Sequence, residues 1–331
     1  MNIFKCTECG NILSGFMPSV CGCGYTVPVI NGVYQFTKDK PISVKGDGLK
    51  WLGYENVGEN YEPGYVYHKD TDSVGNSDYL AEFIGGDKMI LDLGAGLGVT
   101  SISFARSGMR VIAADISQAM LEIAVKRARK HNVSDKIIFA RMNGYKLELA
   151  DGSVDAVIAV DMLHQVDRPE LVIKEILRVL KPDGYFLQYG GSKSLGYTDE
   201  QQAANQRYNE AQKDIQSFYD SLITEAGYAE PPFSSWEAAA NCIKENFAEF
   251  KTLEKTGAYG GENLMEWRLK AGIHKVKTRA SGSKQLIPDD IHNDAWAKTD
   301  NYARTKYGEN YEDMIRYYNF TYSMVLYKPR L

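Results

Sequence analysis

The most constraining feature of the sequence is a short apolar run that leads directly into a glycine-rich turn. The run is Met89–Leu93, the turn is Gly94-Ala-Gly-Leu-Gly98, and Thr100–Ser107 then begins a helix. A short apolar run bounded by glycine predicts a buried strand, and glycine adopts backbone conformations that other residues avoid. Amides at the start of the following helix can bind an anionic or polar ligand. The sequence therefore predicts a strand–turn–helix unit with a ligand-binding turn.

Strand and helix patterns alternate after this turn. Further strands are expected at 110–114, 136–140, 154–160 and 185–189, and helices at 118–131 and from Pro169 to Leu180. Short strands separated by helices predict an α/β fold with a parallel, doubly wound sheet. Two later strands, at 250–258 and 319–327, bring the expected sheet to seven strands, mostly parallel.

An acidic residue ends the second strand of this pattern. Asp115 follows Val111-Ile-Ala-Ala114, where a carboxylate can accept both hydroxyls of a ribose. The spacing of the glycines differs from the G-x-G-x-x-G fingerprint of dehydrogenases, because the third glycine is Gly98 where Val99 would be required. An NAD-dependent dehydrogenase is therefore only a distant alternative.

These motifs resemble those of the class I S-adenosylmethionine-dependent methyltransferases of the broad type 11 group, from about Asp87 to Tyr189. The turn matches the family pattern E/D-x-G-x-G-x-G, and Arg178-Val-Leu-Lys-Pro-Asp-Gly184 is similar to its recurring R-V-L-K-P-G-G. The resemblance implies a Rossmann-like fold that binds S-adenosylmethionine. It assigns the cofactor-binding role to Asp92, Gly94, Ala95, Gly96, Gly98, Asp115, Ile116, Asn143, Gly144 and Asp161. Asn143 stands where the family usually has an aspartate that meets the adenine amino group, and its carbonyl oxygen can accept the same bond.

One histidine is a candidate catalytic residue. The segment Asp161-Met-Leu-His-Gln-Val166 resembles the family segment that lies near the transferable methyl group. His164 could act there as a general base that deprotonates the acceptor. The alternative that His164 only packs over the cofactor or bonds the backbone stays open. The sequence contains no recognisable hydrolytic triad motif and no H-E-x-x-H motif.

Four of the five cysteines lie within the first 23 residues, and they form two pairs. The pairs are Cys6 with Cys9 and Cys21 with Cys23, whereas Cys242 stands alone. Such a quartet in a reducing compartment predicts a metal site. Four thiolates leave no open position for catalysis, so the expected role of a Zn²⁺ ion is structural.

The segment after the cysteines, Tyr25–Phe36, predicts a hairpin around Asn31-Gly32. Residues 1–40 resemble a small zinc ribbon, although the second pair is Cys-x-Cys instead of Cys-x-x-Cys. Residues 41–76 are expected to form a linker or lid, in which Tyr61, Tyr65 and Tyr67 could cover the cofactor. Residues 77–190 are the expected cofactor-binding core, and 191–331 a helical substrate cap with the closing strands.

Composition limits the classes of function. Of 331 residues, 44% are hydrophobic and 24% charged, which excludes general disorder. No apolar run approaches the ~18 residues of a membrane span, and no signal segment opens the chain, so a cytoplasmic protein is expected. The net charge of −5 disfavours a nucleic-acid substrate.

The function that we expect is methyl transfer from S-adenosylmethionine to a small molecule. One alternative is an RNA methyltransferase that grips RNA with the zinc ribbon. Another is a non-catalytic, cofactor-binding partner protein. The oligomeric state stays open.

Overall fold

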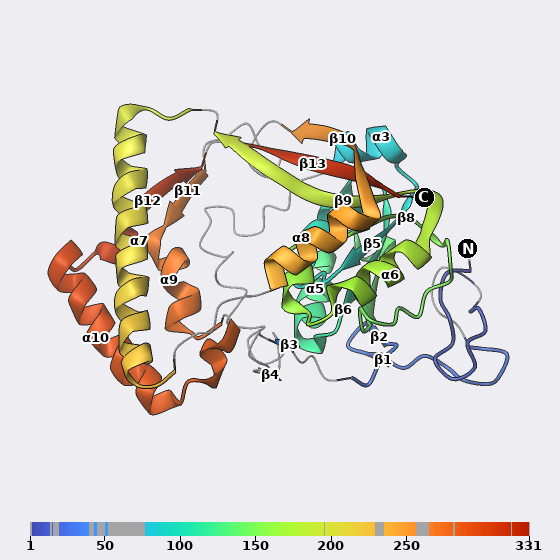
Figure 1. Ribbon diagram of the computed structural model, residues 1–331, viewed down its shortest axis with the longest axis horizontal. Helices are drawn as coiled ribbons and strands as arrows, with labels where there is room; N and C mark the ends of the chain where they lie inside the picture. The colour runs from blue at the N-terminus through green and yellow to red at the C-terminus, as the bar shows by residue number, and fades with distance from the viewer. Residues whose placement is uncertain are drawn as a thin grey trace.

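The computed structural model shows an α/β body with a helical unit at one end (Figure 1). The described residues are 2–13, 15, 20–39, 43–44, 50–51, 77–194, 196–228, 235–255, 265–280, 282–318 and 320–330. The expected lid residues Tyr61, Tyr65 and Tyr67 lie outside them. Among the described residues, no helix is both long and apolar enough to cross a membrane.

The body is built around one sheet in the order β1-β2-β7-β6-β5-β8-β9-β13-β10. Strands β2, β7, β6, β5, β8 and β9 run parallel, while β13 is antiparallel to β9 and to β10. The strand that leads into the glycine turn is β5 (Met89–Leu93), and those that follow the turn are β6 (Arg110–Asp115), β7 (Ile137–Arg141), β8 (Val154–Ile158) and β9 (Leu180–Ser194). The remaining strands of the sheet are β1 (Val29–Ile30), β2 (Val33–Gln35), β10 (Phe247–Lys255) and β13 (Phe320–Pro329).

The prediction of a doubly wound, largely parallel sheet is confirmed, but the prediction of seven strands is wrong. The sheet has nine strands, because the hairpin β1–β2 adds to it at β7. This hairpin belongs to the N-terminal segment that carries the four clustered cysteines (within residues 1–40), called the cysteine-bearing segment below. Tyr34 and Gln35 pair with Ala140 and Arg141. An outer strand of a sheet has unpaired N–H and C=O groups that accept such an addition, and local patterning does not reveal which edge is used.

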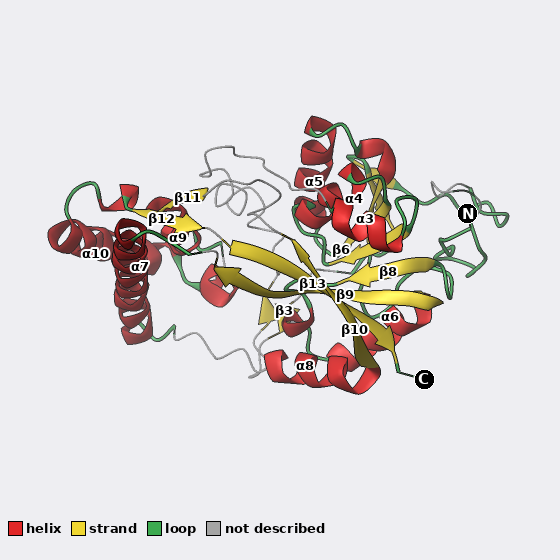
Figure 2. Cartoon of the chain, turned by 90° about the horizontal axis from the view of Figure 1, so that it is seen from above, coloured by secondary structure: helices red, strands yellow, loops and turns green. Residues whose placement is uncertain are grey.

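Helices cover both faces of the sheet, so that each face buries its apolar side chains (Figure 2). One face carries α3 (Asp78–Ile84), α4 (Val99–Arg106) and α5 (Gln118–Lys130), whose buried residues join a common core. The other carries α6 (Pro169–Val179) and α8 (Ser235–Asn246). Pro169 begins α6, where a missing N–H costs nothing.

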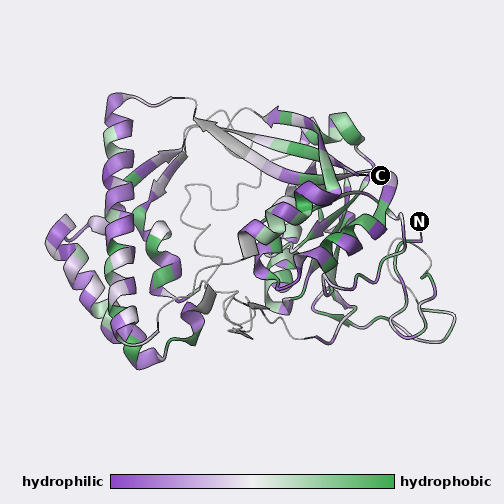
Figure 3. Ribbon diagram, viewed as in Figure 1, coloured by the Kyte–Doolittle hydropathy of each residue, from purple (hydrophilic) through white to green (hydrophobic). Residues whose placement is uncertain are grey.

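A second unit of three helices and a strand pair lies at the far ends of β9 and β13 (Figure 1). Its members are α7 (Asp199–Glu225), α9 (Leu269–Lys277), α10 (Asp289–Tyr307), β11 (Met265–Arg268) and β12 (Ile315–Tyr318). The unit has apolar clusters of its own, and most residues of α7 and α10 are hydrophilic (Figure 3).

Residues 191–331 were expected to form a helical cap with the closing strands, and the structure also contains a separate strand pair there. Strands β11 and β12 pair there, and the Trp267 and Tyr318 rings meet across them with centroids 5.1 Å apart. Such cross-strand aromatic contacts stabilise a strand pair. The shorter elements are β3 (Ser43–Val44), β4 (Lys50–Trp51), and the 3₁₀ turns η1 (Ser134–Lys136), η2 (Leu163–Gln165), η4 (Gly282–Leu286) and η5 (Tyr311–Asp313).

Candidate cofactor site and cysteine cluster

The residues assigned to the cofactor lie in or just after strands β5, β6, β7 and β8. Parallel strands place their carboxyl ends at one edge of the sheet, which is where open α/β sheets bind ligands. Gly94, Asp115 and Asn143 are thereby brought together from separate parts of the sequence, with Asp161 beyond the neighbouring strand β8.

The backbone of the glycine turn adopts a conformation that would be strained for other residues. Gly94, Gly96 and Gly98 all have positive φ, at 77°, 51° and 73°. The amides of Gly94 and Ala95 both donate to the carbonyl oxygen of Ala114, at 2.8 and 3.0 Å. These bonds tie the turn to the end of β6 and hold it across the sheet edge.

Close packing is a second reason for glycine at two of these positions. A Cβ atom on Gly94 would stand 2.6 Å from Met162 Cγ, and one on Gly98 would stand 2.9 Å from Ala124 Cβ. At Gly96 the nearest atom, Met120 Cε, would be 3.6 Å away, an ordinary contact. At Gly96, therefore, the positive φ and not close packing is the reason for glycine.

Asp115 connects the turn to the next helix. Its Oδ2 accepts from the amide of Gly96 and its Oδ1 from the amide of Ser117, both at 2.9 Å. The side chain is thus hydrogen-bonded both to the turn and to the N-cap of α5.

Asp92 lies beneath the turn and is buried, with only 2% of its surface exposed. Its Oδ2 accepts from Ser101 Oγ of α4 at 2.6 Å. Burial, with a smaller contribution from the nearby Asp115 charge, raises the pKa of Asp92 to about 7 against the hydrogen bonds from Ser101. The side-chain hydrogen bond from Ser101 links β5 to α4.

Beyond Asp115, the edge continues at Ile116 and Asn143. Asn143 Oδ1 accepts from the amide of Tyr145 at 3.0 Å, and its Nδ2 donates to Asp39 Oδ2 at 2.7 Å. Arg141 joins the same group by donating from Nε to the carbonyl of Ile116 and from Nη2 to the carbonyl of Asp39. Gly144 lies close to the tip of Met162, since a Cβ there would be 3.0 Å from Met162 Cε.

The segment after β8 forms the wall of a cavity of about 580 Å³. Asp161, at the start of that segment, has φ +49° and is exposed. His164 is 8% exposed, and burial lowers its pKa below the ordinary value, while the charge of Asp161 opposes that shift. The other lining residues come from β9, α8, β10 and β13, including Gln188, Ile243, Phe247, Glu249 and Tyr327.

Three residues at this edge were not identified from the sequence. Met162 lies in the segment Asp161–Val166, and only its packing against Gly94 and Gly144 shows that it belongs to this edge of the sheet. Arg141 directly follows the strand predicted at 136–140, without any local signal for a ligand site. Asp39 lies about a hundred residues from Asn143, and their contact depends on the pairing of β2 with β7.

The four clustered cysteines meet at one point. All four Sγ atoms lie within 4.8 Å of one another, with Cys6 and Cys23 at 3.8 Å and Cys9 and Cys21 at 3.5 Å. Tetrahedral zinc with Zn–S bonds of about 2.3 Å places sulfur atoms at roughly this separation. The donor set and spacing therefore fit such an ion. Cys242 lies apart on α8.

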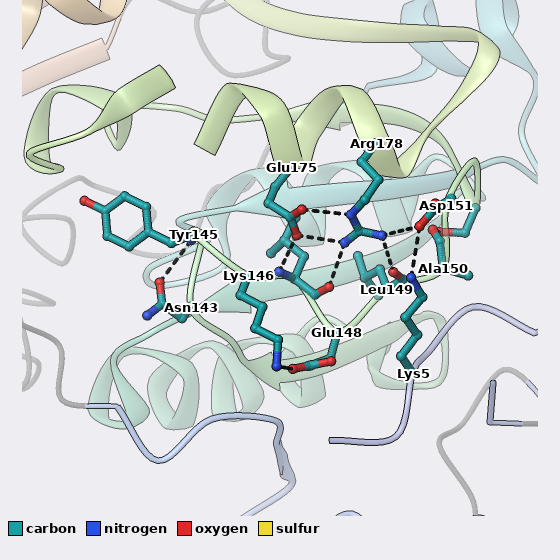
Figure 4. Close-up of polar contacts among 12 residues, drawn as sticks. Lys5, Asn143, Tyr145, Lys146, Glu148, Leu149, Ala150, Asp151, Glu175 and Arg178 are labelled. Atoms are coloured by element: carbon teal, nitrogen blue, oxygen red, sulfur yellow. Dashed lines mark hydrogen bonds and ion pairs between the residues drawn. The ribbon is translucent and has the colours of Figure 1, made fainter. Parts of the chain in front are cut away.

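The cysteine-bearing segment is docked on the core (Figure 4). Lys5 donates its amide to the carbonyl of Glu148 at 2.9 Å and its Nζ to Asp151 at 2.9 Å. Arg178 reaches the same loop, bonding Asp151 and the carbonyls of Leu147 and Leu149 at 2.6–2.8 Å. The recurring arginine motif thus supports the loop on which the cysteine segment rests.

Comparison with known proteins finds a similarity in the central part of the chain. Residues 91–188 match the family model described as "Methyltransferase domain". These residues are therefore similar to methyltransferase domains. They span the end of β5 through most of β9, and so include the glycine turn, Asp115, Asn143 and His164.

The curated relatives resemble the chain over about 30% of its length. A demethylmenaquinone methyltransferase of Clavibacter sepedonicus is 41% identical over 95 residues, 29% of this chain and 38% of that protein. A ubiquinone/menaquinone biosynthesis C-methyltransferase of Rhodopseudomonas palustris is 36% identical over 101 residues, 30% of this chain and 40% of the relative. The chain thus spans less than half the length of these relatives.

Among solved structures, a methyltransferase of Thiobacillus denitrificans in complex with S-adenosyl-L-homocysteine is 16% identical. It covers 84% of this chain and 100% of its own, with a TM-score of 0.44.

Proposed function

We propose that this protein transfers a methyl group from S-adenosylmethionine to a small-molecule acceptor. The observation that carries the proposal is the arrangement of Asp115, whose carboxylate is hydrogen-bonded to Gly96 of the turn at the carboxyl edge of the sheet. This arrangement combines a backbone shaped for close approach with an acceptor for ribose hydroxyls. The methyltransferase domain and its relatives support the assignment.

The cofactor, when bound, supplies an electrophilic methyl group on sulfur. The residues of the chain have to orient the two reactants and exclude water, and such alignment supplies up to roughly 7–11 kcal/mol of a barrier. We assign the ribose to Asp115, and the amino-acid end of the cofactor to the glycine turn and Asp161. The base end is assigned to Ile116, Asn143 and Gly144.

We assign the acceptor to the cavity beside His164. The cavity lies next to Asp161 and Met162, and its lining combines apolar residues such as Ile243 and Phe247 with polar ones such as Gln188 and Glu249. A lowered pKa keeps the buried imidazole of His164 neutral near pH 7, as a general base requires. We propose that His164 accepts the proton of the acceptor group.

We further propose that Cys6, Cys9, Cys21 and Cys23 bind one structural Zn²⁺ ion. Their sulfur atoms converge as described above, and four ligands leave no position for a substrate. The site requires reduced thiols, which fits a cytoplasmic protein. The short cysteine segment gains from the ion the stability that it cannot derive from a core of its own.

Calorimetric titration with S-adenosylmethionine and S-adenosylhomocysteine tests the cofactor assignment. Wild type should bind both, and Asp115→Ala and Gly96→Val should each weaken binding at least about ten-fold. The first loses an acceptor of charge-assisted bonds, and the second places a β-branched residue at positive φ. Asp135→Asn, an exposed residue at the opposite end of β7, is the control and should bind as wild type does. Absence of binding by wild type contradicts the proposal.

A further inference from the structure

The nucleobase end of the proposed cofactor site is bordered by a carboxylate from the N-terminal segment. Asp39 follows β2, the strand that joins the cysteine-bearing segment to the sheet. Its Oδ2 is 2.7 Å from Asn143 Nδ2, directly beyond the end of β7. The inference developed from this contact rests on the proposed function.

Strand order determines which end of the cofactor faces Asp39. The glycine turn follows β5 and the ribose acceptor Asp115 follows β6, so the base attached to the ribose extends toward β7. Asn143 and Asp39 lie at that strand, and β2 lies next to it. The exocyclic amino group of adenine therefore needs an acceptor in this region.

Asn143 is only partly suited to this task. Its Oδ1 already accepts the amide of Tyr145, and its Nδ2 is a donor, which cannot bind an amino group. The carboxylate of Asp39 offers acceptors only. Its side chain is exposed rather than covered by other parts of the described chain.

Asp39 is also held in position through its backbone. Arg141 Nη2 donates to the carbonyl of Asp39 at 2.7 Å, while Arg141 Nε donates to the carbonyl of Ile116 at 3.1 Å. The amide of Asp39 donates to Thr37 Oγ1 at 3.0 Å. Arg141 thus ties the segment of Asp39 to the residue that follows Asp115.

We propose that Asp39 is a specificity-determining residue that accepts the 6-amino group of adenine, beside Asn143, in the cofactor site. The hydrogen bond from Asn143 lowers the pKa of Asp39, so the acceptor is a carboxylate at neutral pH. In this arrangement the cysteine-bearing segment contributes directly to cofactor recognition.

The test compares the binding of two ligands by calorimetry. S-adenosylhomocysteine carries the 6-amino group, and S-inosylhomocysteine carries an oxygen in its place. Wild type should prefer the adenosyl compound at least about ten-fold, because the inosyl oxygen faces a carboxylate. Asp39→Asn should reduce the preference to about three-fold or less, since an amide can accept from an amino group or donate to an oxygen.

Two controls separate recognition from folding. Asp135→Asn makes the same substitution at the other end of β7 and should keep the wild-type preference. Asp39→Asn should keep the wild-type melting temperature, because its amide oxygen can still accept from Asn143. If it melts earlier, Asp39→Glu should restore most of the preference.

Retention of the full wild-type preference by Asp39→Asn overturns the proposal. So does loss of the preference in Asn143→Ala combined with its retention in Asp39→Asn, which would make Asn143 the residue that reads the base. Failure of wild type to bind either ligand would instead contradict the proposed function itself.

Discussion

At the residue scale, Asp92 combines burial with a single hydrogen bond from a side chain, Ser101. Its pKa is raised to about 7 from an ordinary value of 3.8. As pH rises from 4 to 7, the unfolded state therefore releases this proton while the folded state keeps it. By linkage, the contribution of Asp92 to the free energy of unfolding falls over this range and is constant above it.

We predict that Asp92→Asn removes this pH dependence. Relative to the variant, wild type should lose roughly 2–4 kcal/mol of unfolding free energy between pH 4 and pH 7. Urea unfolding of both proteins at pH 4.5, 6 and 7.5 measures the difference. Parallel pH profiles would show that Asp92 ionises normally in the folded protein.

His164 is the second residue whose environment sets its chemistry. Burial lowers its pKa, and the Asp161 charge partly opposes the shift. We predict that NMR titration of the imidazole, assigned with His164→Gln, yields a pKa below 6.5. Asp161→Asn should lower the pKa further, because the favourable charge is removed, and Asp135→Asn should leave it unchanged. A pKa that rises in Asp161→Asn would contradict the described geometry.

At the element scale, helix α6 supports the loop that precedes β8. Arg178 donates to two loop carbonyls and to the carboxylates of Glu175 and Asp151, and Lys5 of the cysteine segment shares Asp151 (Figure 4). A guanidinium makes this set of bonds because its donors are fixed in one plane. The motif around Arg178 thus stabilises the loop before β8, a role that the resemblance alone did not reveal.

We predict that Arg178→Ala lowers the free energy of unfolding by about 2–4 kcal/mol, since it leaves loop carbonyls and a half-buried Glu175 without their donor. Arg178→Lys should lower it by a smaller amount. Lys174→Ala, on an exposed position of the same helix, should stay within about 0.5 kcal/mol of wild type. Urea unfolding monitored by circular dichroism provides all three values, and equal effects of Arg178→Ala and Lys174→Ala would refute the assigned support.

At the scale of the whole molecule, the cysteine segment is part of the main body. Phe4, Val27 and Phe36 are buried in the same apolar cluster as β5, β7 and α6, and the Phe4 and Phe36 rings stack at 5.1 Å. Loss of order near the cysteines therefore exposes part of the central core. A metal ion at this position would stabilise the entire body.

We predict one zinc ion per chain, measured by elemental analysis of the purified protein. Chelation should lower the melting temperature by roughly 5–10 °C. Cys9→Ser should lose the ion and melt as the chelated protein does, while Cys242→Ser should retain both zinc and stability. A metal-free wild type with unchanged melting would contradict the zinc proposal.

The sequence by itself determined the alternation of strands and helices, the glycine turn and the cysteine quartet. These features depend on local periodicity, backbone conformation and ligand chemistry, which neighbouring residues specify. Tertiary structure alone decided that β1 and β2 join the sheet and that β11 pairs with β12. It also brought Asp39 to Asn143 and Met162 to Gly94. Those contacts join residues far apart in the chain, and their formation depends on which strand edges and surfaces remain to be covered once the core has packed.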